Sequence, residues 1–507
     1  MSFPLPRVRR RPRLSSLLFV AGVSLAACSR GSEDAGQAEA PAKDEKLAAR
    51  ESCPDAPRFE HRFENVPTRY DQLETWVEAI GSSEAKRVLL DDAEIAELNR
   101  RASEIDGAWR DPWRAEAPIE AGGELPRGVT VDPEKVAAEI EERLVWMGAQ
   151  VADAAYEQAV EGSWDRAAAR ARASQPVDEL RWIAAEASLR CAPADPEEGL
   201  FKPPRDPDFD RNNCASLHPG EWVRVLRRGA ADDDDWYYVH AGHTVGWLHA
   251  PKWTPPVDDP TRARLAAAPR VFPLRDDLRT QGGVALRLGA AFRLRGKPDA
   301  DPLELWVPGP EGVVDDEVAA AEVSVGPFPL TRERAWSWAL AELGASYGWG
   351  GRAGERDCSR LLRDVFVGMG LELARHSGVQ AKLGTERIDV AGVDEATKRR
   401  IIDEAAARGL LLLYMPGHIM LYVGRDGDRQ FAVSSISEYL TPCEGGPDTV
   451  HRLDRVVVSD LEVGRGSARR SFIERIDTLV VFGRDTTRSA PGDDGPGDDG
   501  PGSDSAR

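Results

Sequence analysis

One stretch constrains this chain more than any other: residues 347–366, which read Y-G-W-G-G-R-A-G-E-R-D-C-S-R-L-L-R-D-V-F. A turn-rich, glycine-rich half leads to Asp357 and Cys358, and apolar residues then recur at the three-and-four spacing of an amphipathic helix. Cys358 is therefore predicted in the first turn of a helix, where unpaired backbone N–H groups and the helix dipole favour negative charge. Because the thiolate is the nucleophilic form of cysteine, this setting predicts a lowered thiol pKa.

A cysteine that attacks a carbonyl needs a base within reach, and the base needs an orienting partner. His418 is the candidate base, because it stands at the start of the apolar run 418–423, just after Pro416 and Gly417. An imidazole at that point can project from the edge of a sheet. Taken alone such a histidine is more often structural, and only its combination with Cys358 favours a catalytic role.

Three motifs occur in order along the chain: Y-G-W-G-G…D-C-S, L-A-R-H-S-G-V-Q and M-P-G-H-I-M-L-Y-V-G. Together they resemble the NlpC-type family of papain-like peptidoglycan peptidases. The resemblance implies a cysteine nucleophile at a helix start, a histidine base on the first sheet strand and a third polar residue on the next strand. It also implies cleavage of the γ-D-glutamyl–diamino acid bond in cell-wall stem peptides, with no metal or organic cofactor.

Position by position, the resemblance makes Cys358 the nucleophile, His418 the base and Ser434 the third catalytic residue. It assigns Tyr347 to placing the substrate and the oxyanion. It assigns Asp357 to pairing with the α-amine of the substrate, although the same side chain could instead cap the helix, and both roles could hold.

The chain departs from the family pattern at several positions. Ser434 stands where members have His, Asn or Gln, and its shorter hydroxyl can still accept an imidazole N–H. Arg360 stands where many members have Gly, and Ala374 and His376 fall in a segment usually read as Leu-Pro-Arg-Asn-Ser. His451 is an alternative source of an imidazole, although its sequence position does not match.

The first 27 residues indicate export. They carry five arginines and no acid, and the apolar stretch 14–27 is too short to span a bilayer. The run L-A-A-C that ends at Cys28 resembles the lipobox of bacterial lipoproteins, in which the cysteine becomes the lipidated first residue. We expect a lipid-anchored protein of the cell envelope, on the periplasmic side of a bacterial membrane, and the alternative is an ordinary signal peptide cut nearby.

The net charge and the cysteines fit that compartment. A formal charge of −20 disfavours a nucleic-acid partner, since such binding depends on cations that neutralise phosphates. The expected partners are peptidoglycan stem peptides and, through the lipid, a membrane. Disulfides are permitted outside the cytoplasm, and Cys191 and Cys214 are the nearest pair, but the connectivity among these two, Cys53 and Cys443 stays open.

The chain is predicted to be multidomain, because its length exceeds what one core can serve. We expect a signal peptide (1–27), a flexible tether (28–54) and a mostly α-helical stabilising region (55–190). Two small all-β Src-homology-3-like barrels (191–258 and 259–328), an α+β papain-like cysteine peptidase domain (329–483) and a disordered tail (484–507) follow. The barrels are predicted from short apolar strands separated by turns, and Trp236 is expected to wall one end of the substrate groove.

His240, His243 and His249 resemble a metal cluster at first sight. They occupy alternate strand and turn positions, with no acidic or cysteine ligand at a fitting spacing, so no metal is expected. Two other functions stay open. A decayed peptidase could act as a catalytically weakened wall-binding lipoprotein, for which Ser434 is the main support, and an amidase that cleaves between sugar and peptide would use the same Cys/His pair.

Overall fold

The computed structural model describes residue 53 and residues 57–116, 125–151, 162–198, 200, 209–230 and 235–484. Cys28, the predicted signal peptide, nearly all of the predicted tether and the tail after Arg484 lie outside the described residues. In the part that is described, no helix combines the length and the apolar character needed to cross a bilayer.

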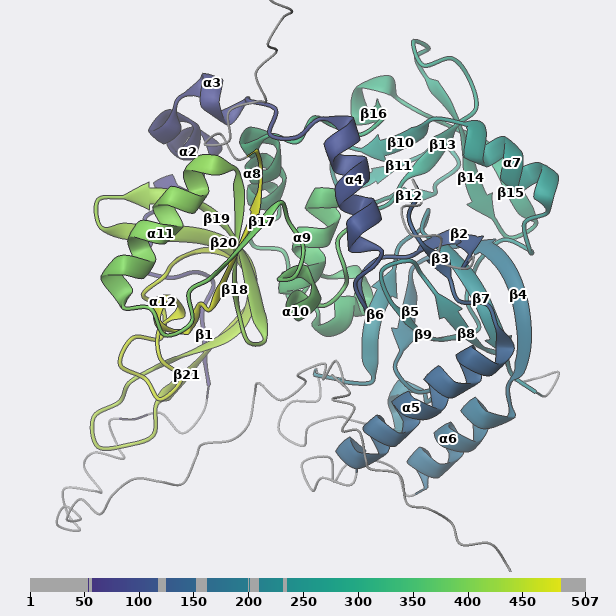
Figure 1. The fold of residues 1–507 in the computed structure, drawn as a ribbon, viewed down its shortest axis with the longest axis horizontal. Coiled ribbons are helices and arrows are strands. Elements are labelled where there is room, and N and C mark those ends of the chain that lie inside the picture. Colours follow the sequence, from purple (N-terminus) through teal and green to yellow (C-terminus); the bar gives the residue numbers. More distant parts are fainter. Residues whose placement is uncertain are drawn as a thin grey trace, which may run out of the picture.

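The C-terminal unit is built on a seven-stranded sheet of order β1-β21-β20-β19-β18-β22-β17 (Figure 1). Neighbouring strands run antiparallel, except β1 beside β21. The strands are β1 (Arg58–Phe59), β17 (Glu386–Asp389), β18 (Leu410–Met415), β19 (His418–Asp426), β20 (Arg429–Thr441), β21 (Thr449–Asp460) and β22 (Thr478–Phe482).

Helices cover this sheet, and β22 is buried along its whole length. The helices are α8 (Arg332–Ala341), α9 (Cys358–Val367), α10 (Ser377–Gln380), α11 (Glu395–Arg408) and α12 (Phe472–Arg475). Helix α9 packs against β19 and β20, whereas α11 packs against β18 and β22. Leu361, Leu362, Val365 and Phe366, which recur at helical spacing, are all 0% exposed. The predicted α+β character of this unit is therefore confirmed.

Helices from the N-terminal third also belong to this core. They are α2 (Leu73–Ile80), α3 (Ser82–Ala85) and α4 (Asp92–Ala102). Trp76 of α2 is 1% exposed and packs against Phe431 of β20, with ring centroids 5.5 Å apart. The prediction of one separate helical region over residues 55–190 is thus wrong, because the apolar faces of α2 and α4 are buried in the C-terminal unit.

The first β unit is a six-stranded sheet of order β4-β7-β8-β9-β5-β6 together with the helices packed on it. Its strands are β4 (Gln175–Trp182), β5 (Ala187–Arg190), β6 (Asn213–Leu217), β7 (Trp222–Arg228), β8 (Trp236–His240) and β9 (Val245–His249), and its helices are α5 (Pro133–Val151) and α6 (Ser163–Ala173). The sheet begins at Gln175, so the predicted start at residue 191 is wrong. Charged residues lie among the apolar ones in β4. Asp178 of β4 is accommodated because it pairs with Arg224 of the neighbouring strand β7 at 2.6 Å.

The second β unit comprises a five-stranded sheet of order β15-β14-β13-β10-β16, a two-stranded ribbon and α7. Its strands are β10 (Arg270–Pro273), β11 (Leu278–Arg279), β12 (Ala285–Leu286), β13 (Phe292–Leu294), β14 (Leu303–Gly309), β15 (Gly312–Val318) and β16 (Val323–Val325), and α7 spans Asp259–Ala267. Trp182 and Trp222 of the first β unit share a core with Phe292, so the two units pack on each other. Their likeness to Src-homology-3 barrels stays a prediction.

Short elements and two disulfides complete the described chain. The short elements are β2 (Asp111–Ala115), β3 (Gly128–Val129) and the 3₁₀ turns η1 (Thr68–Asp71), η3 (Pro196–Glu198), η4 (Ala320–Glu322) and η5 (Trp349–Gly354). Cys191 pairs with Cys214 inside the first β unit. Cys53 pairs with Cys443, which lies after β20, and this bond joins residues 390 positions apart. The connectivity left open by the sequence is thereby resolved.

Candidate active site

The turn that leads into α9 is shaped by a close approach to the first β unit. Gly350 and Gly351 have φ values of 64° and 80°, a region that glycine adopts without strain. A Cβ on Gly350 would lie 2.2 Å from the carbonyl oxygen of Asn213, and one on Gly351 would lie 2.4 Å from Ser216 Oγ. Glycine is therefore required here because β6 lies directly against η5.

Cys358 is the first residue of α9, as predicted, and Asp357 is its cap. The Oδ1 atom of Asp357 accepts the backbone N–H of Arg360 at 2.9 Å, which satisfies one of the donors left open at a helix start. The thiol lies against the beginning of β19, where the backbone N–H of Ile419 donates toward it.

His418 opens β19, next to Ile419, and Ser434 lies on the neighbouring strand β20. The Nε2 atom of His418 is 3.1 Å from Ser434 Oγ. Ser434 is 0% exposed and the imidazole is half-buried, flanked by the ring of Phe472 at 5.7 Å. The structure thus places Ser434 against His418, and Cys358 against Ile419, the residue next to His418, although Cys358 and Ser434 are 76 positions apart in the sequence.

The protonation states differ from the prediction. Burial, assisted by the Asp357 carboxylate, raises the pKa of Cys358 to about 12, against the opposing effect of the Ile419 N–H and the Arg375 guanidinium. The predicted lowering of the thiol pKa is therefore wrong, because desolvation outweighs the helix start. Burial, with a smaller contribution from Arg475, lowers the pKa of His418 to about 3. The resting pair is a neutral thiol beside a neutral imidazole.

Asp357 has a partner that sequence reasoning missed. Arg375 binds it through two nitrogens, at 3.0 Å to Oδ1 and 2.6 Å to Oδ2, and also donates to Ser359 Oγ at 2.9 Å. Burial opposes the charge of Asp357, but the Arg375 guanidinium holds the pKa of that carboxyl below its usual range. Arg375 lies in the quoted L-A-R-H-S-G-V-Q motif, so the motif contained the signal.

Aromatic side chains line the turn before Cys358. Tyr347 is half-buried and stacks on Phe209, with ring centroids 5.9 Å apart, and Phe209 also contacts Trp349 at 5.3 Å. Phe209 precedes β6 and is the aromatic residue that the first β unit contributes here. The sequence offered no pattern around Phe209 that would have marked it.

The predicted role of Trp236 at the substrate groove is wrong. Trp236 is 2% exposed and stacks on His249, with ring centroids 4.6 Å apart. Its ring faces the core formed with α5 and α6, and it is not part of the turn before Cys358. Trp236 cannot wall the groove because the helix pair covers that face of the sheet.

The remaining histidines have separate surroundings. His249 pairs with Asp195 at 2.8 Å, and His240 Nδ1 accepts the backbone N–H of Gly242 at 3.0 Å. No group of three or more His, Cys, Asp or Glu side chains among the described residues could hold a metal ion.

His451 does not orient His418. Its Nδ1 pairs with Glu60 at 2.5 Å and its Nε2 with Thr441 at 2.8 Å, and it lies in β21 opposite Tyr439. The alternative in which His451 supplies the imidazole partner is therefore wrong.

Comparison with known proteins places the C-terminal unit in a family. Residues 344–455 match the family model of the NlpC/P60 family, so the C-terminal unit carries an NlpC/P60 family domain. Members of that family are typically peptidoglycan endopeptidases, which suggests a cysteine peptidase that acts outside the cytoplasm on the cell wall. No curated protein sequence matches the chain.

One solved structure shows a related fold, and a second aligns only weakly. An NlpC/P60 endopeptidase from Photobacterium damselae subsp. piscicida superposes with a TM-score of 0.59 at 12% identity, covering 80% of this chain and 96% of that one. NlpC2 from Trichomonas vaginalis aligns at 11% identity over 57% of this chain and 97% of its own, with a TM-score of only 0.22. The first likeness covers most of the chain and shows a shared fold.

Proposed function

We propose that this chain is a cysteine endopeptidase that cleaves the γ-D-glutamyl–diamino acid bond of peptidoglycan stem peptides. The observation that carries the proposal is the contact between His418 Nε2 and Ser434 Oγ at 3.1 Å, next to a thiol at the start of α9. It supplies an oriented base beside a nucleophile, which is the minimum that acyl transfer by cysteine requires.

The orientation of the imidazole defines the proton path. Since Nε2 faces Ser434, it carries the proton and donates to Oγ, and Nδ1 is the nitrogen that takes the thiol proton. Because the resting thiol is neutral, the proton leaves Cys358 Sγ as the sulfur attacks the γ-glutamyl carbonyl carbon. His418 is then a general base in the first step, and the imidazolium gives this proton to the leaving amine.

The backbone N–H of Cys358 supports the oxyanion. It stands at the start of α9, where N–H groups have no partner within the helix, and such donors stabilise a tetrahedral intermediate. Collapse of the intermediate breaks the C–N bond and leaves a thioester. Water, deprotonated by His418, then attacks the thioester, releases the γ-glutamyl acid and restores the thiol.

Tyr347, with its neighbour Phe209, is proposed to place the substrate at the turn before the nucleophile. Asp357 is proposed to attract the α-amine of a stem peptide while it caps α9. Arg375 already neutralises this carboxylate through two hydrogen bonds. The substrate amine would then be a second cationic partner of a carboxylate that is already ion-paired. Asp357→Asn keeps a cap acceptor and removes the charge. Loss of preference for peptides with a free amine would support this role, and an unchanged preference would leave Asp357 as a cap.

Export and anchoring complete the proposal. Two disulfides fit an oxidising compartment, and the sequence before Cys28 supports attachment through a lipid. A Cys28→Ser variant is expected in the soluble rather than the membrane fraction, with an unmodified N-terminus by mass spectrometry. Membrane retention of that variant would contradict the lipid anchor.

Mass spectrometry of products from defined stem peptides tests the function. The expected products are the γ-glutamyl peptide and the peptide that begins with the diamino acid, and Cys358→Ala should yield neither. Release of these products by Cys358→Ala would refute the mechanism. A muramyl-linked substrate cut between sugar and peptide would instead identify an amidase that uses the same Cys/His pair.

A catalytically weakened wall-binding protein is the second candidate, and the serine that contacts His418 favours it. A thiol that stays neutral at rest depends entirely on His418 for activation, and Ser434 is a weaker orienting group than an imidazole or an amide. Wild-type protein that binds peptidoglycan but turns over no stem peptide would establish this second function.

A further inference from the structure

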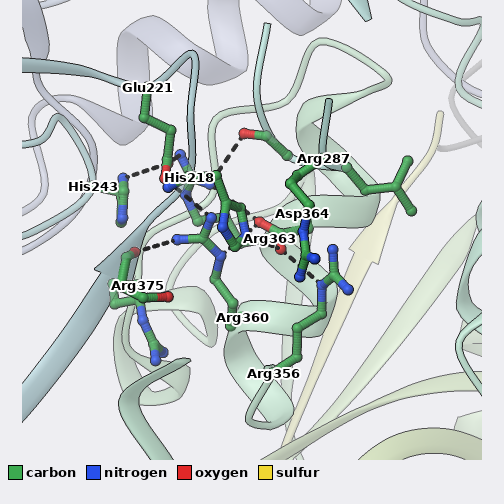
Figure 2. Close-up of polar contacts among 12 residues, drawn as sticks. His218, Glu221, His243, Arg287, Arg356, Arg360, Arg363, Asp364 and Arg375 are labelled. Atoms are coloured by element: carbon green, nitrogen blue, oxygen red, sulfur yellow. Dashed lines mark hydrogen bonds and ion pairs between the residues drawn. The ribbon is translucent and has the colours of Figure 1, made fainter. Parts of the chain in front are cut away.

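A second polar cluster lies on α9, between the C-terminal unit and the two β units (Figure 2). Arg360 is its first member and is 0% exposed. Its guanidinium donates to the carbonyl oxygen of Ser216 at 2.9 Å and to Oε2 of Glu221 at 3.1 Å. Both partners belong to the first β unit, so Arg360 links that unit to the first turn of α9.

Glu221 is held firmly at the other end of this link. It lies just before β7 and is 6% exposed. Its Oε2 accepts the backbone N–H of His218 at 2.6 Å, while its Oε1 pairs with Arg363 at 3.0 Å. Burial works against its charge, but Arg360 and Arg363 hold the pKa of Glu221 below the usual range. The carboxylate therefore meets two arginines of the same helix.

Asp364 extends the cluster toward the second β unit. It is 0% exposed and pairs with Arg360 at 2.8 Å and with Arg356 Nε at 2.8 Å. Arg356 also binds Asp276, which follows β10, at 2.5 Å and 2.8 Å. A Cβ on Gly289 of the second β unit would lie 2.1 Å from Asp364 Oδ1, so the backbone there touches the carboxylate.

These contacts make the position of α9 depend on both β units. A buried charge that loses one partner is strongly destabilising, so small displacements of α9 are resisted by every pair in the cluster. The effect reaches the nucleophile through Arg360, because the backbone N–H of this residue is also the donor to the Asp357 cap. Side chain and backbone of one residue thus join the first β unit to the turn that carries Cys358.

We propose that Glu221 and Arg360 are positioning residues for Cys358, with the first β unit acting as a fixed support for the catalytic turn. The first β unit is then part of the frame of the active site. The kinetic consequences rest on the proposed function, whereas the effect on the thiol does not.

Glu221→Gln in the full chain tests the proposal, because it keeps the shape of the side chain and removes its charge. Below the melting transition, kcat on stem peptide is expected to fall at least tenfold with KM changed less than twofold. Alkylation of Cys358 by iodoacetamide is expected to become severalfold faster, since the thiol is only 8% exposed and a loosened turn exposes it. Glu179→Gln is the matched control, because Glu179 is ion-paired with Arg181 within β4 (2.6 Å). This variant should leave kcat, KM and the alkylation rate unchanged.

A folded Glu221→Gln protein with wild-type kcat and wild-type alkylation would overturn the proposal. If this variant does not fold, the double variant Glu221→Gln/Arg360→Met, which removes both charges, is measured in its place. Where the single variants fold, the double variant should have a kcat no lower than the worse single one, and losses that multiply would refute the link. Should stem peptides prove not to be substrates, the alkylation rates still decide, so the two failures are distinguishable.

Discussion

Replacement of Ser434 by alanine is the sharpest test of the catalytic geometry. The change removes the Oγ atom that lies 3.1 Å from His418 Nε2 at a fully buried position. In the resting state this is a bond between neutral groups and contributes about 0.5–1.5 kcal/mol, whereas the imidazolium formed during attack makes a charged bond of about 1.5–3 kcal/mol. The difference of about 1–2 kcal/mol is lost only in the transition state and corresponds to a fall of about 5–30-fold in kcat.

Steady-state release of the diamino-acid product, followed by liquid chromatography, measures this effect. KM should stay within about twofold of wild type, because Ser434 orients the base and does not touch the substrate. Ser435→Ala is the matched control: Ser435 is also fully buried on β20, but its Oγ donates to the carbonyl of Arg356 at 2.8 Å. A Ser434→Ala protein with the same kcat as Ser435→Ala would refute the assignment of Ser434 as the orienting residue.

Three further outcomes are expected. The folded protein lowers the pKa of His418 to about 3 from 6.5. As pH falls, His418 is therefore protonated in the unfolded chain at a higher pH than in the folded protein. Stability should therefore be lost as pH falls from 6.5 toward 3, and thermal melts at pH 7 and pH 4.5 should differ less in His418→Gln than in wild type. Cys53→Ser/Cys443→Ser opens a loop of 390 positions and should lower stability by about 2–5 kcal/mol, and an unchanged denaturant midpoint would contradict this. Trp236→Ala should cost about 3–5 kcal/mol of stability and leave KM unchanged. A raised KM with normal stability would show instead that Trp236 contacts the substrate.

Two members of the proposed trio, Cys358 and His418, were predictable because each belongs to a local pattern. Apolar spacing after Cys358 and the capping side chain of Asp357 define a helix start, and both depend on residues within about two turns. His418 begins an apolar strand after a Pro-Gly turn, and strands of that kind form wherever a core can cover them. Ser434 was assigned only through the resemblance, which implies a third polar residue on the next strand.

The electrostatics of the site could not be predicted in the same way. The helix start alone predicts an acidic thiol, but in the folded protein burial raises the pKa of Cys358. Burial is a property of everything that packs around the turn, including Ile419 of β19, which lies 61 positions later in the sequence. The balance between dipole and desolvation is therefore decided only when the tertiary structure forms.

Contacts between residues far apart in the chain could not be predicted from the sequence either. Arg360 is an unusual residue in its motif, but nothing near it identifies Glu221, which is 139 positions away, as its partner. The same holds for Phe209 beside Tyr347 and for the helices α2 and α4, which fold into the C-terminal unit. Such contacts depend on how separate units pack, and local periodicity carries no information about that.

The sequence by itself determined which reactive groups the chain carries and in which local structure they stand. These are a cysteine at a helix start, a histidine at a strand start and a glycine-rich turn that leads to Asp357. These features arise from short-range forces, since capping, turn geometry and apolar spacing act over a few residues. Only the tertiary structure decided the state of these groups, with a neutral thiol, a carboxylate neutralised by Arg375 and a helix α9 that is ion-paired to Glu221. Those properties arise from desolvation and buried charge pairing, which exist only after distant segments have come together.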